Sequence, residues 1–310
     1  MKQCDRSVLY TVHSAQNRPS CTVEPGEEFQ VLTQLNTGEW LQSAEDEWHP
    51  SKITGPNFTN CIEVAGAKTG DVLAVDILNI QVDSLAYTGF ASWRNPPCQR
   101  IYPNNWDIVA KIVEIKDDEV QWNSRLRLRT RPMIGTIGVA PAAGEIPNGE
   151  AGRHGGNMDV QEVCAGTTVY LPVNVAGALL HVGDVHAIMG DGEINRAGGL
   201  ECRGTLTLRC RLLPAGPGFQ WIRLENEEYI MAVACVEDME TAFYEAAGEL
   251  IRWMEHGYGF RPQDAYCLLG QVMEARCTAI VNLQKPYICK IKKAYLRAEE
   301  AETEKKVDLC

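Results

Sequence analysis

The stretch TGDVLAVDILNI, residues 69–80, contains the pattern that decides the fold: a turn glycine, an acidic residue and then an apolar run rich in β-branched residues. Glycine supplies the positive φ that tight turns require, and β-branched residues suit the surface of a pleated, half-buried strand. The same order returns at PGEEFQVL (25–32), AGTTVYLPV (165–173) and VGDVH (182–186). Repeated short strands joined by glycine turns predict a mainly β fold, similar to a β-sandwich with many short strands.

The hydrophobic period changes after about residue 230. Apolar residues from 239 to 254 recur at the spacing of one helix face, with Asp238 as the expected N-cap and Gly257 as the expected end. Pro262 suits the first turn of a second helix, which continues to residue 273. The C-terminal part is therefore predicted to be α+β.

These patterns divide the chain into two predicted parts with no evident linker between them. Residues 1–230 form a β-rich domain that carries a metal-binding and catalytic segment at 134–201. Residues 231–310 form the C-terminal part, with two helices and a charged helical tail over 294–306. We expect the second part to pack on the first.

The composition excludes several classes of partner. The 310 residues carry a net charge of −12, which disfavours binding to nucleic acid or to an anionic membrane surface. The longest apolar stretch, 169–182, is too short to span a bilayer, and no leader-like segment opens the sequence. Twelve cysteines are scattered without a C-x-x-C pair, so we expect reduced, mostly buried thiols in a cytoplasmic protein.

The metal-competent side chains that we single out lie in one window of forty residues, 154–193. It holds three of the six histidines beside three aspartates and two glutamates. Imidazole and carboxylate groups bind divalent cations, and a spare carboxylate can transfer a proton. Asp184 and His186 are two apart on a predicted strand, so their side chains are expected on one face. His181 lies in an apolar run and is expected to be a core or supporting imidazole.

The separate pieces of this window also have ordinary structural explanations. Asp191-Gly192 alone is typical of a hairpin turn, and His154-Gly155-Gly156 alone is typical of a surface loop. The chain could be a non-catalytic binding module that is stabilised by a metal ion. A cysteine nucleophile, with Cys164 beside a glycine turn, is a rival mechanism.

Several motifs together closely resemble those of the acetamidase/formamidase family. They include IGTIGVAPA (134–142), GRHGGNMD (152–159), YLPV (170–173) and GDVHAIMGDGE (183–193), with TGP (54–56) and GAKTGDVLAV (66–75) upstream. The resemblance covers nearly the whole chain. It implies a mainly β fold, homodimers or larger assemblies, and hydrolysis of short linear amides such as formamide or acetamide to a carboxylate and ammonia. Some relatives open lactams, so a cyclic amide remains an alternative substrate.

The resemblance also implies a divalent metal, zinc most often and sometimes calcium nearby, and it assigns roles to residues. We expect Asp184 and His186, with His154 or Asp159, to hold zinc, which activates a water molecule. Mixed imidazole and carboxylate ligands leave the metal identity open. The expected residues are His154, Asp159, Asp184 and His186 for the metal, Glu193 and Asp191 for catalysis, and Asn157, Gly155 and Gly156 for the substrate amide.

Overall fold

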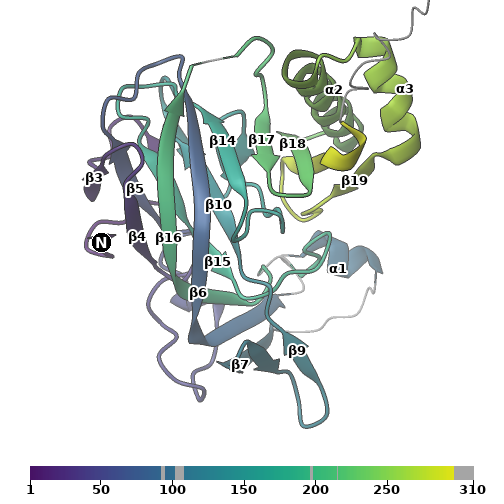
Figure 1. Ribbon diagram of the computed structural model, residues 1–310. Coiled ribbons are helices and arrows are strands. Elements are labelled where there is room, and N and C mark those ends of the chain that lie inside the picture. The colour runs from purple at the N-terminus through teal and green to yellow at the C-terminus, as the bar shows by residue number, and fades with distance from the viewer. Residues whose placement is uncertain (92–94, 102–107, 196–197, 215, 297–310) are drawn as a thin grey trace, which may run out of the picture.

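The computed structural model describes residues 1–91, 95–101, 108–195, 198–214 and 216–296. Eighteen strands within these residues form one curled and largely antiparallel sheet, and helices gather beside its C-terminal strands (Figure 1). The predicted fold class, mainly β with an α+β C-terminal part, is confirmed. The strands are β1 Lys2–Cys4, β2 Val12–Ser14, β3 Cys21–Val23, β4 Glu28–Thr33, β5 Thr59–Val64, β6 Val72–Ala91, β7 Ile108–Lys116, β8 Glu119–Gln121, β9 Arg127–Arg129, β10 Met133–Val139, β11 Glu145–Pro147, β12 Ala151–Gly152, β13 Gly155–Asn157, β14 Thr168–Pro172, β15 Leu180–His186, β16 Glu201–Leu213, β17 Ile222–Glu225, β18 Tyr229–Val236, β19 Glu274–Cys277 and β20 Lys285–Lys292.

Strand β6 holds the sheet together. It begins with the apolar run that decides the fold, and its first six residues are all buried. It pairs with β14, β16 and β7, so three segments far apart in sequence meet along one strand. The main hydrophobic core includes Leu73, Val75 and Ile77 of this strand. The site described below lies at the end of this core.

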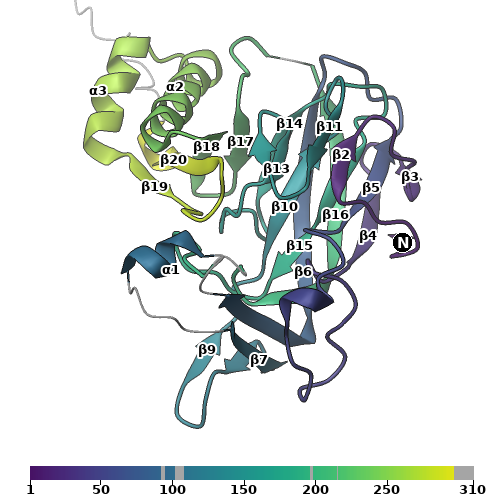
Figure 2. The same cartoon turned by 180° about the vertical axis from the view of Figure 1, so that it is seen from behind.

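The helices are α1 Pro96–Ile101, α2 Met239–Tyr258 and α3 Pro262–Val272, with short 3-10 turns at Pro50–Lys52 and Lys293–Tyr295. Helix α2 covers β18 and β20, and α3 packs against α2 (Figure 2). Asp238 caps α2, because its carboxylate accepts the backbone N–H of Thr241 at 2.7 Å. Gly257 lies inside α2, however, and Gly259 ends the helix with a φ of 73°.

The predicted domain boundary at residue 230 falls within β18, which pairs with β17 on one side and β20 on the other. A second hydrophobic cluster joins α2 and α3 to these strands. The division into 1–230 and 231–310 stays a prediction. Of the predicted charged tail, residues 297–306 lie outside the described residues.

The expectation of reduced thiols is wrong for one pair. Cys4 and Cys21 form a disulfide, because β1 and β3 lie beside β4 and β5 and bring their Cα atoms to 5.7 Å. Their separation of 17 residues carries no recognisable spacing. Among the described residues, no helix is long and apolar enough to cross a membrane.

Candidate metal centre

Strand β10 forms the floor of the candidate site. All seven of its residues are buried, and it pairs with both β13 and β15. Two carboxyl groups approach its backbone at Gly135, where a Cβ atom would lie 2.6 Å from Asp159 Oδ1 and 2.7 Å from Asp184 Oδ2. Glycine at position 135 therefore leaves the room that both carboxyl groups occupy.

His186 lies at the centre of a cluster of acidic side chains that we call the carboxylate centre: Asp159, Asp184, Glu193 and Glu201 together with His186. His186 ends β15 and is the register partner of Glu201, the first residue of β16. Its Nε2 atom lies 3.2 Å from Glu201 Oε1 and 3.6 Å from Asp184 Oδ1. All five side chains are buried.

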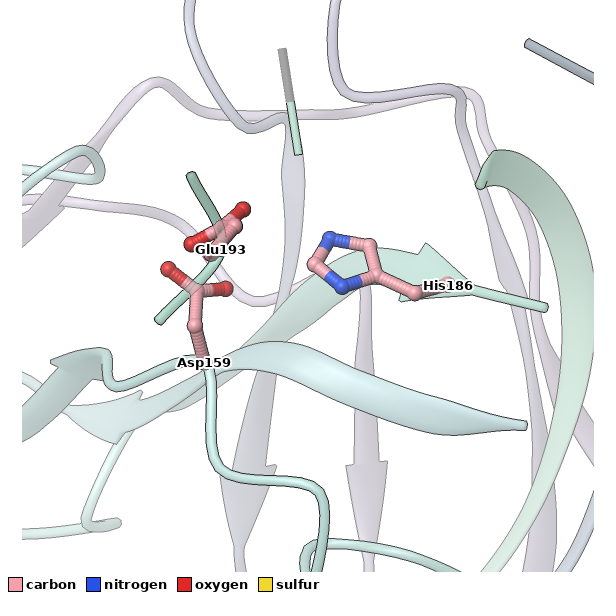
Figure 3. Close-up of side chains that lie close together, drawn as sticks. All are labelled: Asp159, His186 and Glu193. Atoms are coloured by element: carbon pink, nitrogen blue, oxygen red, sulfur yellow. The ribbon is translucent and has the colours of Figure 1, made fainter. Parts of the chain in front are cut away.

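Two overlapping sets of residues in this centre could hold a metal ion. One set is Asp159, His186 and Glu193, and the other is Asp184, His186 and Glu201; within each, the ligand atoms lie within 4.8 Å of one another. Figure 3 shows the carboxyl groups of Asp159 and Glu193 close together, with the ring of His186 pointing toward them. His186 belongs to both sets, so it is the residue on which the whole arrangement depends.

Three members of the centre have an unusual backbone conformation. Asp159, Asp184 and Glu193 have φ values of 46°, 59° and 43°, in the left-handed region that residues with a Cβ atom rarely occupy. Such backbone strain costs about 1–3 kcal/mol per residue and is concentrated at functional sites. The fold therefore places these carboxyl groups at a cost in stability.

The hydrogen bonds of the centre leave one side of each aspartate open. Asp159 Oδ2 accepts a hydrogen bond from Asn282 Nδ2 at 2.9 Å, and Asp184 Oδ2 accepts one from Thr136 Oγ1 at 3.0 Å. Buried polar atoms nearly always have partners, so those without one point to a missing ligand. The buried atoms without a hydrogen bond are Asp159 Oδ1, Asp184 Oδ1, both ring nitrogens of His186, Glu193 Oε2 and Glu201 Oε2. This donor set fits a divalent cation.

Burial makes the charged forms of these acids costly. It raises the pKa of Asp159 to about 6, with a further contribution from the charge of Asp184. Burial likewise raises the pKa of Glu201 to about 8 and that of Glu193 well above its ordinary value. For His186, burial alone would lower the pKa, but the nearby charges of Glu201 and Asp184 outweigh it and raise the pKa. Without a cation, the centre therefore retains protons that most carboxyl groups lose.

A cavity of about 340 Å³ reaches the centre from one side. Glu193 lines this cavity together with Asn195 and Gly198. A small molecule in the cavity can therefore approach Glu193, although that side chain is only 8% exposed.

The fold is similar to that of proteins of known structure. A predicted acetamidase/formamidase from the thermophile Thermoanaerobacter tengcongensis is 30% identical, with a TM-score of 0.85 over 95% of this chain and 96% of that chain. The chain belongs to the acetamidase/formamidase family. The acetamidase from Bacillus halodurans is 29% identical to this family member, with a TM-score of 0.86 over 94% of this chain and 98% of that chain.

The sequence comparisons agree on the family. The model of the acetamidase/formamidase family matches residues 142–293. The acetamidase of Mycolicibacterium smegmatis is 26% identical over 264 residues, a match that spans 64% of each chain. This chain spans less than two thirds of the length of the curated relatives that it matches, between 16% and 64%.

His154 lies apart from the carboxylate centre, in a group of three buried imidazoles that we call the histidine cluster: His13, His154 and His181. The ring of His13 is 4.9 Å from that of His154 and 4.7 Å from that of His181, between ring centroids. Neither metal-competent set includes His154. Burial lowers the pKa of both His154 and His181 to about 4, so these rings are neutral. Metal binding by His154 stays a prediction.

The residues predicted to hold the substrate amide lie between the two groups of side chains. Gly155 and Gly156 pair with β10 through their backbone. Asn157 follows them, and its Oδ1 atom accepts a hydrogen bond from Asn57 Nδ2 at 2.8 Å and lies 3.0 Å from Thr136 Oγ1. Thr136 also bonds Asp184, so Asn157 is linked to the carboxylate centre through one side chain. Substrate binding by these three residues stays a prediction.

Asp191 lies outside both metal-competent sets. Its side chain is 66% exposed and pairs with Arg276 at 2.8 Å, while Gln161 donates a second hydrogen bond to it. Cys164, the rival nucleophile, is half-buried, and burial raises the pKa of its thiol. The catalytic role of Asp191 stays a prediction.

Glu201 is the member of the centre that the sequence does not reveal. It lies eight residues after the recognisable motif and begins β16, where alternation would predict a surface position. The register of β15 with β16 places it opposite His186. The only available signal is an acidic residue directly before an alternating strand, and this is too common to be diagnostic.

Proposed function

We propose that this chain hydrolyses the carbon–nitrogen bond of short linear amides to a carboxylate and ammonia, and that the reaction takes place at the carboxylate centre. The observation that supports it most is the set of buried ligand atoms without hydrogen bonds on Asp159, Asp184, His186, Glu193 and Glu201. Family membership supports the same reaction. The proposed cation is zinc, because imidazole and carboxylate ligands suit it. An additional calcium site, a homodimer and a cytoplasmic location remain part of the proposal.

The residues of the centre would divide the work between them. Asp159, Asp184, His186 and Glu201 would hold the cation, and Asn282 and Thr136 would orient the two aspartates by the hydrogen bonds described above. A divalent cation at this place supplies Lewis acidity and makes water a better nucleophile near neutral pH.

Glu193 would move the proton. It lines the cavity, and burial raises its pKa well above the ordinary value, with a further contribution from Asp159. A carboxyl group with a raised pKa can hold a proton near neutral pH and deliver it to the departing nitrogen, which amide hydrolysis requires. Asn157 would orient the substrate amide from the neighbouring strand.

The test measures ammonia released from formamide and acetamide by the purified protein. We expect activity that a chelator removes and that added zinc restores. Glu193→Gln should keep its metal content and lose activity by about 100-fold or more, since general acid–base groups contribute about 10²–10⁴-fold. Full activity in Glu193→Gln would remove Glu193 from the chemistry, and chelator-resistant activity would remove the cation.

Asp191→Asn is the matched control, because it neutralises an acidic residue of the same segment outside the centre. We expect it to keep the metal and to retain activity within a few-fold. Loss of activity as large as that of Glu193→Gln would instead support the catalytic role that the sequence predicts for Asp191. Tight amide binding without ammonia release would identify a binding module.

A further inference from the structure

A second cavity, of about 370 Å³, lies beside the carboxylate centre and has a mixed lining. One part is apolar and includes the rings of Trp48, Tyr87 and Phe90. The other part carries side-chain amides, among them Asn57 and Asn195. Cavities of about 300–1,000 Å³ with apolar walls and a few polar groups are typical of sites for drug-sized molecules.

This cavity adjoins the carboxylate centre through three of its lining residues. Asn57 donates to Thr136 Oγ1 at 3.3 Å, and the same Thr136 hydroxyl donates to Asp184. Tyr87 is the register partner of Glu201 across β6 and β16. Asn195 lies two residues after Glu193 and also lines the cavity that reaches Glu193.

The aromatic wall is held by contacts with neighbouring side chains. The hydroxyl of Tyr87 makes hydrogen bonds of 3.0 Å with Thr37 and 2.9 Å with Asn36, which fix the ring. Trp48 stacks on it at 6.4 Å between centroids with an interplanar angle of 23°. A preformed aromatic surface binds flat apolar groups without first having to order its own side chains.

Two polar atoms of the lining residues have no partner although they are buried: Trp48 Nε1, a donor, and Asn195 Oδ1, an acceptor. Leaving such atoms unpaired is costly, so a small side-chain rotation that turns them toward a ligand in the cavity would be favourable. The N–H groups of a primary amide are suitable donors for the Asn195 oxygen. The cavity therefore suits a molecule that joins an apolar body to a polar group.

We propose that this cavity holds the acyl part of the substrate, and that the preferred substrates are primary amides with an aromatic or similarly bulky acyl group. The inference rests on the proposed amidase function and names its substrate class. Formamide and acetamide would leave the aromatic wall uncovered. One methylene group in an apolar pocket changes kcat/KM by roughly 10–200-fold, so a phenyl group should have a large effect.

The experiment compares kcat/KM for acetamide and phenylacetamide in the zinc-loaded protein. We expect phenylacetamide to be preferred by at least about 100-fold. Equal or better hydrolysis of acetamide would overturn the inference and leave the proposed function in place. If neither these amides nor formamide release ammonia, both fail.

Variants test whether this cavity causes the preference. Ala91→Leu fills the cavity at the end of β6 and should lower the ratio of kcat/KM for phenylacetamide to that for acetamide at least 10-fold. Ile53→Trp narrows the cavity from a position that is 37% exposed, so it tests the same idea if Ala91→Leu fails to fold. Ala143→Leu, at an exposed position between β10 and β11, is the matched control and should change neither substrate. An unchanged ratio of the two substrates in both cavity variants would overturn the inference.

Discussion

The carboxylate centre and the histidine cluster lie along the same strand, near Gly135 and Gly138 of β10, and both are buried. Their electrostatic requirements are opposite. The acids at Gly135 repel one another when ionised, so they need either protons or a cation. The imidazoles at Gly138 are neutral, because burial lowers the pKa of His154 and His181 to about 4. Equal burial therefore yields a cation site in one place and an uncharged packing element in the other.

The largest expected effect distinguishes a histidine of each group. His186→Ala removes the residue shared by both metal-competent sets, so we expect it to lose bound zinc and to lower kcat by more than about 1,000-fold. His154→Gln should keep its zinc, because His154 lies in the histidine cluster. Metal content by mass spectrometry and ammonia release measure both.

The comparison breaks if His154→Gln loses zinc as His186→Ala does. That result would support the metal-binding role that the sequence predicts for His154. A circular dichroism spectrum of each variant, compared with the parent protein, excludes loss of fold as the cause.

The second effect is the loss of stability that we expect in the metal-free protein as the pH rises, caused by the carboxylate centre. The pKa of Glu201 is raised to about 8 in the folded state, from an ordinary value of 4.5. The folded state therefore binds more protons, and this contribution to stability is present below pH 4.5 and is lost as the pH rises through 8. Between pH 5 and 8 the free energy of unfolding should fall in both proteins. We expect the fall to be smaller in Glu201→Gln than in the parent by more than about 2 kcal/mol, since one pKa unit corresponds to about 1.4 kcal/mol. Urea unfolding of chelated protein measures it, and parallel curves would contradict it.

The smallest effect is the loss of stability that we expect as the pH falls, caused by the histidine cluster. The pKa of His154 falls from 6.5 to about 4 on folding because of burial. Stability is therefore complete above pH 6.5 and is lost as the pH falls toward 4. His154→Gln cannot take up this proton and should lose roughly 2 kcal/mol less than the parent between pH 7 and 4.5. Urea midpoints at the two pH values check this, and an equal loss in both proteins would show that His154 is not the group that titrates.

Local patterns in the sequence predict the fold well. The glycine turn before Val72 begins β6, and Asp238 and Pro262 begin the two long helices at the expected residues. These signals succeed because turns and caps depend on neighbouring residues. The end of α2 is displaced by two residues, from Gly257 to Gly259, because two glycines offer the same conformational freedom and only helix packing selects between them.

The candidate site is less predictable, because it depends on strand pairing. Asp184 and His186 lie 3.6 Å apart, as their two-residue spacing predicts, although the left-handed backbone at Asp184 departs from a regular strand. Glu201 joins them only through the register of β15 with β16. His13 meets His154 through contacts between segments more than a hundred residues apart. Residue spacing along the chain does not predict which of these side chains come into contact.

The left-handed backbone at Asp159, Asp184 and Glu193 has a consequence for anyone who wishes to make this protein more heat-resistant. Glycine or asparagine would relieve the backbone at each position, so a search guided by thermal tolerance alone would choose these three first. Each such replacement would remove a carboxyl group that the proposed chemistry needs. Gains in robustness are better sought in the exposed loops far from β10.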